Sequence, residues 1–323
     1  MSPYLSFWIA WAVGLLALLG AWPRLTGLTL RGPWSWLAAF WLAMGIAEAL
    51  VQSQTDDVGE PMWAAAARYI AAIGVFCPVM SVLGAKRPQH TAWHFIVGSL
   101  WVVLVLPAAE VLVLHPGQEL FVLDARAWFL TILIGMGTLH LLMTRFWLAG
   151  LLFAFGQVAL LGQYLPLIAG SESWNQQGWG PAWGAAAFAA AMVIAWLTRA
   201  PAVDSRWDRL WFDFRDMYGV LWALRVASRV NEAASLNDWP IELRWQGFVK
   251  KPSGVTMQEP PADIAEALDS CLRNLLRRFV STEWTSERLN SDASTTAATG
   301  DLSMETAEDA AGAANVAESD SAR

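Results

Sequence analysis

MWAAAARYIAAIGVFCPVMSVLG, residues 62–84, and AWHFIVGSLWVVLVLPAAEVLVL, residues 92–114, are two apolar runs joined by the basic turn AKRPQHT. Each run is 23 residues long, and a helix needs about 20 residues to cross the apolar core of a bilayer. The pair therefore predicts two membrane-spanning helices with a short basic loop between them.

Five further apolar runs surround this pair, at residues 4–22, 34–53, 127–143, 146–169 and 181–198. The chain is 56% hydrophobic and only 15% charged, which is too apolar for an ordinary soluble domain. No basic residue precedes the first run, so we interpret it as a retained span and not as a signal peptide. The sequence thus predicts an all-α polytopic membrane protein whose seven transmembrane helices occupy residues 1–200.

Basic residues in the short loops predict the orientation of these helices. Cytoplasmic loops of membrane proteins carry an excess of Lys and Arg. Loops on one side carry Arg24, Arg31, Lys86, Arg87 and Arg145. On the other side Arg126 is the exception, in a set of loops that includes Asp56 and Trp174. We therefore expect a bacterial inner-membrane protein with its N-terminus outside and its C-terminus in the cytoplasm.

The pattern changes after residue 200. Asp204 or Ser205 is suited to cap an amphipathic helix that runs to about Asn237, residues 241–245 alternate as a short strand, and a second helix begins near Asp263. Residues 201–289 are therefore expected to form a small, mainly helical cytoplasmic domain. Residues 290–323 hold seven acids and one base, which is −6 of the chain's net charge of −7. This segment is expected to be a disordered acidic tail, and the near-neutral remainder gives no indication of nucleic-acid binding.

The two predicted helices of this domain each have an apolar side, on which a cytoplasmic protein partner is expected to dock. The candidate docking residues are Trp207, Trp211, Phe214, Leu268, Leu272 and Leu275.

Four polar side chains within the apolar runs share one depth near the outer surface. They are Glu48, Arg68, Glu110 and Gln163. Charges inside a membrane are costly and usually face the bundle interior in pairs. This layer is either a binding site for an ion or small solute, or a structural clamp that holds helices together.

His94 and His140 lie at a similar depth near the cytoplasmic ends of neighbouring runs. Two imidazoles on adjacent helices are a possible ligand pair for a metal or a haem, although polar helix ends explain them equally well. The loop WNQQGWGPAW, residues 174–183, resembles the tryptophan-rich motif of cytochrome c assembly proteins, which present haem. It lacks that motif's acidic end and the flanking histidines, so the family is not assigned.

The leading functional hypothesis is a non-catalytic membrane scaffold or sensor that docks a cytoplasmic partner. A small transporter or solute-binding bundle using the outer polar layer is the alternative, and a haem-handling protein is a weaker one. The sequence contains no His-Glu-x-x-His, phosphate-binding lysine loop or Gly-x-Ser-x-Gly motif, which argues against an enzyme without excluding one.

Overall fold

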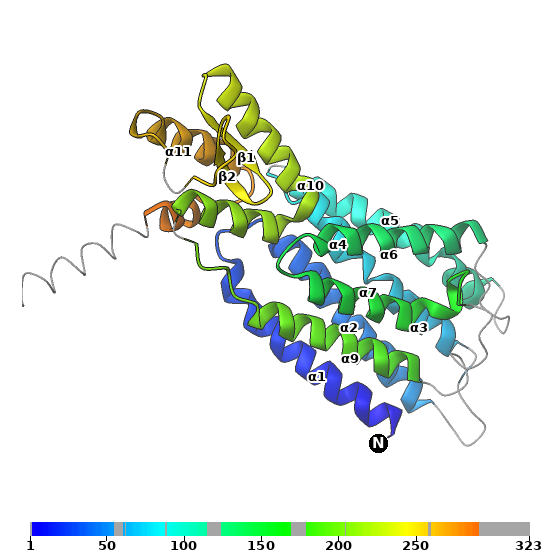
Figure 1. The fold of residues 1–323 in the computed structure, drawn as a ribbon. Coiled ribbons are helices and arrows are strands. Elements are labelled where there is room, and N and C mark those ends of the chain that lie inside the picture. Colours follow the sequence, from blue (N-terminus) through cyan, green and yellow to red (C-terminus); the bar gives the residue numbers. More distant parts are fainter. Residues whose placement is uncertain are drawn as a thin grey trace, which may run out of the picture.

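The computed structural model describes residues 2–54, 61, 63–87, 89–114, 124–168, 179–203, 205–257 and 260–290. Asp56, Trp174, Asp204 and the acidic tail from residue 291 lie outside the described residues. A bundle of helices forms one part of the molecule, and the C-terminal residues stack on one end of it, opposite the N-terminus (Figure 1). We refer to these ends as the domain end and the far end.

Within the described residues, seven helical segments are long and apolar enough to cross a membrane, which agrees with the seven predicted runs. They comprise α1 (Pro3–Ala21) with the short η1 (Trp22–Leu25), α2 (Arg31–Ser53), α3 (Ala64–Ile73) with α4 (Phe76–Leu83), α5 (His90–Val113), α6 (Asp124–Leu142), α7 (Trp147–Leu161) with η2 (Gly162–Tyr164), and α9 (Trp179–Leu197).

The third candidate span is broken between α3 and α4, at Gly74 and Val75. Pro78 follows four residues after Gly74. A proline has no amide hydrogen to donate to the carbonyl four residues earlier, and its ring clashes with that carbonyl. The Gly74 carbonyl instead accepts from the Cys77 amide at 3.1 Å. Pro78 thus divides this span into two short helices.

Small residues allow α1 and α2 to approach closely. The Trp11 and Trp41 indoles each donate to the other's main-chain carbonyl, at 2.9 and 3.0 Å. The Trp41 ring occupies the space that a side chain at Gly14 would need, and Trp11 does the same at Gly45. Small residues are favoured at helix contacts in membranes because they permit this close approach.

The C-terminal domain is built on α10 (Arg206–Leu236), the antiparallel strands β1 (Ile241–Arg244) and β2 (Gly247–Lys250), α11 (Ala262–Leu276) and helical turns at 282–290. The Ser205 hydroxyl caps α10 by accepting from the Asp208 amide at 3.4 Å. The helix, strand and helix that the sequence predicts here are all present. Gly219 adds an unpredicted kink within α10, with φ of 72° and ψ of −176°.

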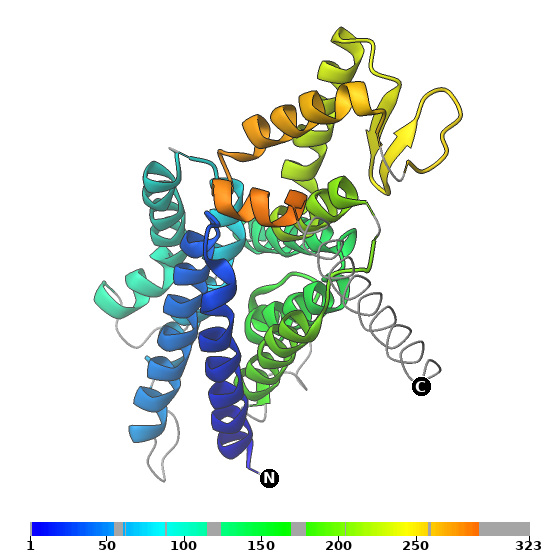
Figure 2. The same cartoon turned by 90° about the vertical axis from the view of Figure 1, so that its left-hand side faces the viewer.

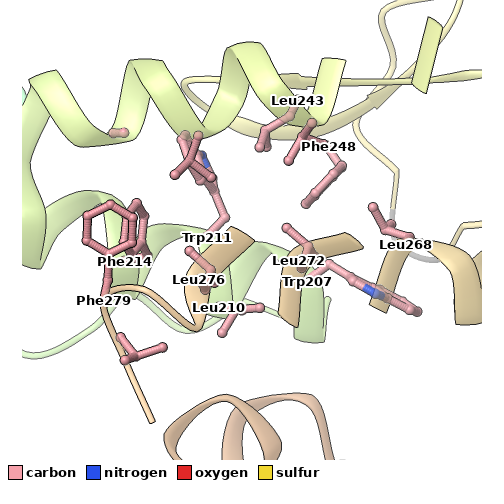
Figure 3. Packing of buried hydrophobic residues seen from close by; sticks show 14 of the residues in the cluster. Trp207, Leu210, Trp211, Phe214, Leu243, Phe248, Leu268, Leu272, Leu276 and Phe279 are labelled. Carbon is pink, nitrogen blue, oxygen red and sulfur yellow. The ribbon is translucent and has the colours of Figure 1, made fainter. Parts of the chain in front are cut away.

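The interior of this domain is one cluster of apolar side chains from α10, α11, both strands and the segment after α11 (Figure 3). Leu28 from the loop after α1 and Ala85 from the loop after α4 belong to the same cluster. The core of the C-terminal domain therefore extends to two loops of the helical bundle. In Figure 2 the orange turns at the end of the described chain lie across the domain end of the bundle.

Candidate functional site

Glu48 and Arg68 form a two-point ion pair at the far end of the bundle. Arg68 Nε donates to Glu48 Oε2 at 2.9 Å and Arg68 Nη2 donates to Oε1 at 3.1 Å. Glu48 is 4% exposed, so its charge depends on such donors. Gln52 also donates to Glu48 at 3.1 Å, and Trp8 donates to Gln52 at 2.9 Å. The carboxylate is thereby held by α2, α3 and, through Gln52, α1.

A cavity of about 110 Å³ opens beside this ion pair and includes Gln163 in its wall. The Tyr69 hydroxyl donates to the Leu104 carbonyl at 3.1 Å, and its ring meets the edge of Tyr164 with centroids 4.8 Å apart. The cavity thus joins an already neutralised ion pair to two tyrosine rings. Because Glu48 and Arg68 neutralise each other, the pair gives the cavity no net charge. The cavity therefore suits a small molecule without net charge, such as a dipolar or zwitterionic one.

The predicted outer polar layer is therefore assembled in part. Glu48, Arg68 and Gln163 line one cavity. Glu110 is exposed near the end of α5 and is not among the described residues that line it.

The two histidines proposed as metal or haem ligands have different immediate neighbours. His94 Nδ1 accepts a hydrogen bond from Trp36 at 2.8 Å. The His140 ring packs against the kink of α10, where a Cβ built on Gly219 would lie 2.1 Å from His140 Nε2. Among the residues that the structure describes, no group of three or more His, Cys, Asp or Glu side chains is placed to hold a metal ion.

The six residues predicted as a docking surface lie inside the C-terminal domain. Five of them are at most 5% exposed, and Leu275 packs against the same core. Their apolar sides face one another across the domain (Figure 3). These side chains are therefore not available to a partner; the amphipathic pattern identified a core. The six are Trp207, Trp211, Phe214, Leu268, Leu272 and Leu275.

Main-chain hydrogen bonds fasten the C-terminal domain to the bundle. In the segment after α11, the Phe279 carbonyl accepts from the Thr29 amide at 3.0 Å. The Arg278 carbonyl accepts from the Arg87 amide at 2.8 Å. The Ser281 amide donates to Gly27 at 2.7 Å. We call these three contacts the joint, and they connect the loops after α1 and α4 to a single short segment of the domain.

One tyrosine, Tyr218, and one tryptophan, Trp222, reinforce the joint. The Tyr218 hydroxyl donates to the Phe279 carbonyl at 2.7 Å and lies 3.0 Å from the Thr29 hydroxyl. Burial raises the pKa of the Tyr218 phenol. The Trp222 indole donates to the Val82 carbonyl at the end of α4, at 3.0 Å.

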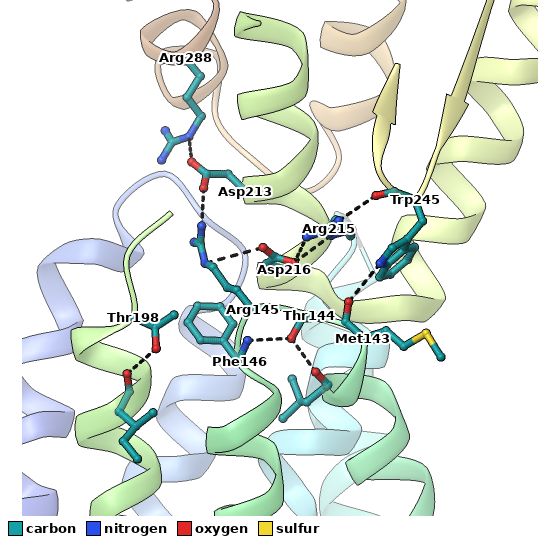
Figure 4. A network of polar contacts seen from close by, with 12 residues as sticks. Met143, Thr144, Arg145, Phe146, Thr198, Asp213, Arg215, Asp216, Trp245 and Arg288 are labelled. Atoms are coloured by element: carbon teal, nitrogen blue, oxygen red, sulfur yellow. Dashed lines mark hydrogen bonds and ion pairs between the residues drawn. The ribbon is translucent and has the colours of Figure 1, made fainter. Parts of the chain in front are cut away.

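An ion-pair network holds the turn between α6 and α7 to α10 (Figure 4). Arg145 binds one carboxylate oxygen of Asp213 at 2.9 Å, and Arg288 binds the other at 2.8 Å. Asp216, whose side chain is fully buried, pairs with Arg215 at 2.8 Å and lies 3.8 Å from Arg145. Removing one member of such a buried network leaves an uncompensated charge, which is strongly destabilising.

Sequence reasoning did not identify this network as a site. In the sequence analysis Arg145 contributes only to the orientation of the helices. The available signal was an arginine in the short turn between two apolar runs, together with acids at positions 213 and 216, which share one side of a helix because they are three residues apart.

Comparisons with protein-family models, curated proteins and solved structures find no match to this chain.

Proposed function

We propose that this chain is a non-catalytic membrane sensor whose C-terminal domain responds to the state of the polar cavity at the far end of the bundle. One observation carries the proposal: the two spans that form the Glu48–Arg68 pair are the same two spans that meet the joint at their other ends. Glu48 is near the end of α2, and Arg68 is in α3.

Both spans reach from the cavity to the joint, the second of them across the break between α3 and α4. The loop before α2 contributes Thr29 to the joint. Val82, near the end of α4, accepts from Trp222 of the domain, and Arg87 in the loop after α4 donates to Arg278. Packed helices transmit small displacements at one end to contacts at the other. A molecule that separates Glu48 from Arg68 would therefore alter the joint.

We further propose that the domain lies in the cytoplasm of a bacterium and that the bundle spans its inner membrane. The basic loop residues Arg24, Arg31, Lys86, Arg87 and Arg145 all belong to the domain end. This distribution supports the orientation because basic loops remain on the cytoplasmic side. A protein partner in the cytoplasm would bind the outer surface of the domain, since its apolar helix sides are internal.

Hydrogen exchange at the amides of the joint tests the sensor proposal. The double substitution Glu48→Gln with Arg68→Met removes both charges together, so no buried charge is left unpaired. We expect faster exchange at the amides of Thr29, Arg87 and Ser281 in the variant. Ser53→Ala at the same end of α2 is the control, because that hydroxyl is exposed and, among the described residues, donates within its own helix turn. Unchanged exchange at all three amides would refute the coupling.

A solute-binding bundle or small transporter is the second candidate, favoured by the cavity next to Glu48 and Arg68. This reading predicts that the same double variant folds and loses binding or uptake of a small zwitterion, while the joint amides exchange as in the parent chain.

A further inference from the structure

A second and larger cavity, of about 640 Å³, lies at the domain end, where α1, α2, α7 and α9 meet α10. Its volume is within the range of about 300–1,000 Å³ that is usual for small-molecule sites. Its inner wall is apolar and includes Leu18, Phe153 and Met192. Its opposite wall includes Asp213 and other charged residues of the ion-pair network. The cavity is thus apolar on one side and charged on the other.

Positive charge is in excess at the charged side. Three arginines, Arg24, Arg145 and Arg288, and two aspartates line the cavity, which leaves one net positive charge. Arg215, which pairs with Asp216 at 2.8 Å, is not part of the lining and is not counted. The nearby Glu287 carboxylate is 3.8 Å from Arg288, but its side chain is 81% exposed and is not part of the lining.

Arg24 is positioned as the anion-binding group of this cavity. Its Nη1 donates to the Trp196 carbonyl at 2.6 Å, and its guanidinium lies over the Trp196 ring, 4.9 Å from the centroid. These contacts fix the plane of the guanidinium. A guanidinium carries five N–H donors in a planar fork suited to phosphate, and the side chain as a whole is exposed.

Tryptophans mark the depth of this charged side. Trp22 and Trp34 pack with ring centroids 4.6 Å apart, and the Trp34 indole donates to the Leu18 carbonyl at 3.1 Å. Tryptophan side chains favour the headgroup level of a bilayer. Arg24 lies between these tryptophans in the chain and is therefore expected at the level of the lipid phosphates, with the apolar wall extending toward the acyl region.

We propose that this cavity binds one anionic phospholipid from the leaflet on the domain side, with its phosphate at Arg24 and an acyl chain along the apolar wall. A soluble anion would leave the apolar wall unfilled, and a neutral lipid would leave the excess positive charge unbalanced. Because Asp213 and Asp216 also line this cavity, the bound lipid contacts the attachment of the domain to the bundle. The proposal does not depend on the sensor function.

The test uses the full-length chain purified in a non-ionic detergent, with native mass spectrometry for bound lipid and thermal unfolding for stabilisation. Dioleoyl phosphatidylglycerol, dioleoyl phosphatidylcholine and inorganic phosphate are compared. We expect phosphatidylglycerol to bind and to raise the unfolding temperature, phosphatidylcholine to bind about tenfold more weakly or worse, and phosphate alone to give no shift.

Two variants and a control localise the binding. Arg24→Gln should weaken phosphatidylglycerol binding about tenfold by removing a charge-assisted contact. Ala195→Trp, which fills part of the cavity, should abolish binding. Arg31→Gln removes a nearby arginine that stacks on Trp22 and does not line the cavity, so binding should stay within about twofold of the parent, because a charge outside the site adds only a weak, screened attraction.

Several results would overturn the proposal. Equal binding of the two lipids would remove the role of charge, and equal losses in Arg24→Gln and Arg31→Gln would remove the role of this cavity. A shift produced by phosphate alone would identify a soluble-anion site instead. If Ala195→Trp does not fold, the comparison between the two arginine variants still decides the question.

Discussion

The imidazole of His140 in α6 fills the space above Gly219, at the kink of α10, so that a Cβ on Gly219 would lie 2.1 Å from His140 Nε2. The backbone of Gly219 has φ of 72° and ψ of −176°, a region that is accessible essentially to glycine alone. The kink therefore depends on the missing side chain in two ways, through the backbone angles and through the contact with the bundle.

Gly219→Ala should lower stability for both reasons. The backbone conformation alone costs about 1–3 kcal/mol, and the overlap with His140 adds to it. We expect a lower unfolding temperature and weaker protection of the Trp222 indole, which bonds to the end of α4. Adding His140→Ala should recover only the part of the stability loss that comes from the overlap with His140.

Gly135→Ala is the matched control for this substitution. Gly135 lies within α6, and a Cβ there meets nothing within 4 Å. Alanine is favoured over glycine by about 1 kcal/mol in a helix interior, so this variant should be neutral or more stable. Full recovery of Gly219→Ala by His140→Ala would show that the backbone angles contribute nothing.

The Glu48–Arg68 pair should behave as a coupled unit. Arg68→Met leaves the buried Glu48 carboxylate without its counter-ion. Breaking a buried pair costs about 3–5 kcal/mol, and less is expected here because the Arg68 side chain is 21% exposed. Adding Glu48→Gln should restore most of the loss, measured as the interaction term of a double-mutant cycle.

An exposed ion pair supplies the comparison for this cycle. Arg229 and Glu232 are 2.7 Å apart, with side chains 68% and 54% exposed, and such pairs contribute about 0–1 kcal/mol. If the Glu48–Arg68 cycle gave an interaction no larger than the Arg229–Glu232 cycle, the far-end pair would not act as a structural clamp.

Depth counted from the sequence predicts that Arg68 shares a layer with Glu48, Glu110 and Gln163, and the structure pairs it with Glu48. Residues rise about 1.5 Å each along a helix, so positions equally far from the membrane surface share a height. Height does not fix direction, however, because each residue also turns by about 100° around the axis. Glu110 was predicted in the same layer, yet it is exposed and is not among the described residues that line the cavity.

The amphipathic pattern of α10 and α11 had a similar limit. It correctly predicts that Trp211 and Leu272 lie on apolar sides of helices. It does not say what covers those sides, since that depends on contacts distant in sequence, such as Leu28 from the loop after α1. The kink at Gly219 was also beyond the sequence, because a glycine inside a helical pattern is compatible with a straight helix.

Labelling from outside the cell tests the proposed orientation. In a chain with Cys77→Ala and Cys271→Ala, a membrane-impermeant maleimide should label Ser2→Cys in intact cells. It should label Lys86→Cys only after the cells are permeabilised, because the basic loops are expected in the cytoplasm. Labelling of Lys86→Cys alone in intact cells would invert the topology.

Asp208 should make the C-terminal domain less stable as the pH rises from about 4 to about 6. The carboxyl is 5% exposed, and burial raises its pKa from 3.8 to about 6, although the hydrogen bond from the Phe248 amide, at 2.8 Å, acts in the opposite direction. The folded protein holds the proton up to about pH 6, and the unfolded chain releases it near pH 3.8. The stabilisation is therefore complete below pH 4 and is lost above pH 6.

Asp208→Asn removes this dependence, because the amide oxygen can still accept from the Phe248 amide without carrying a charge. A difference of about two pKa units corresponds to on the order of 3 kcal/mol. The variant should therefore gain stability over the parent as the pH rises from 4 to 7, measured as the difference between their unfolding temperatures.

Asp263→Asn is the control, since Asp263 also lies in the first turn of a helix but is exposed. It tests whether losing a favourable charge at a helix N-terminus produces the same trend. A difference between parent and Asp208→Asn that stays constant from pH 4 to pH 7 would show that Asp208 does not titrate in this range.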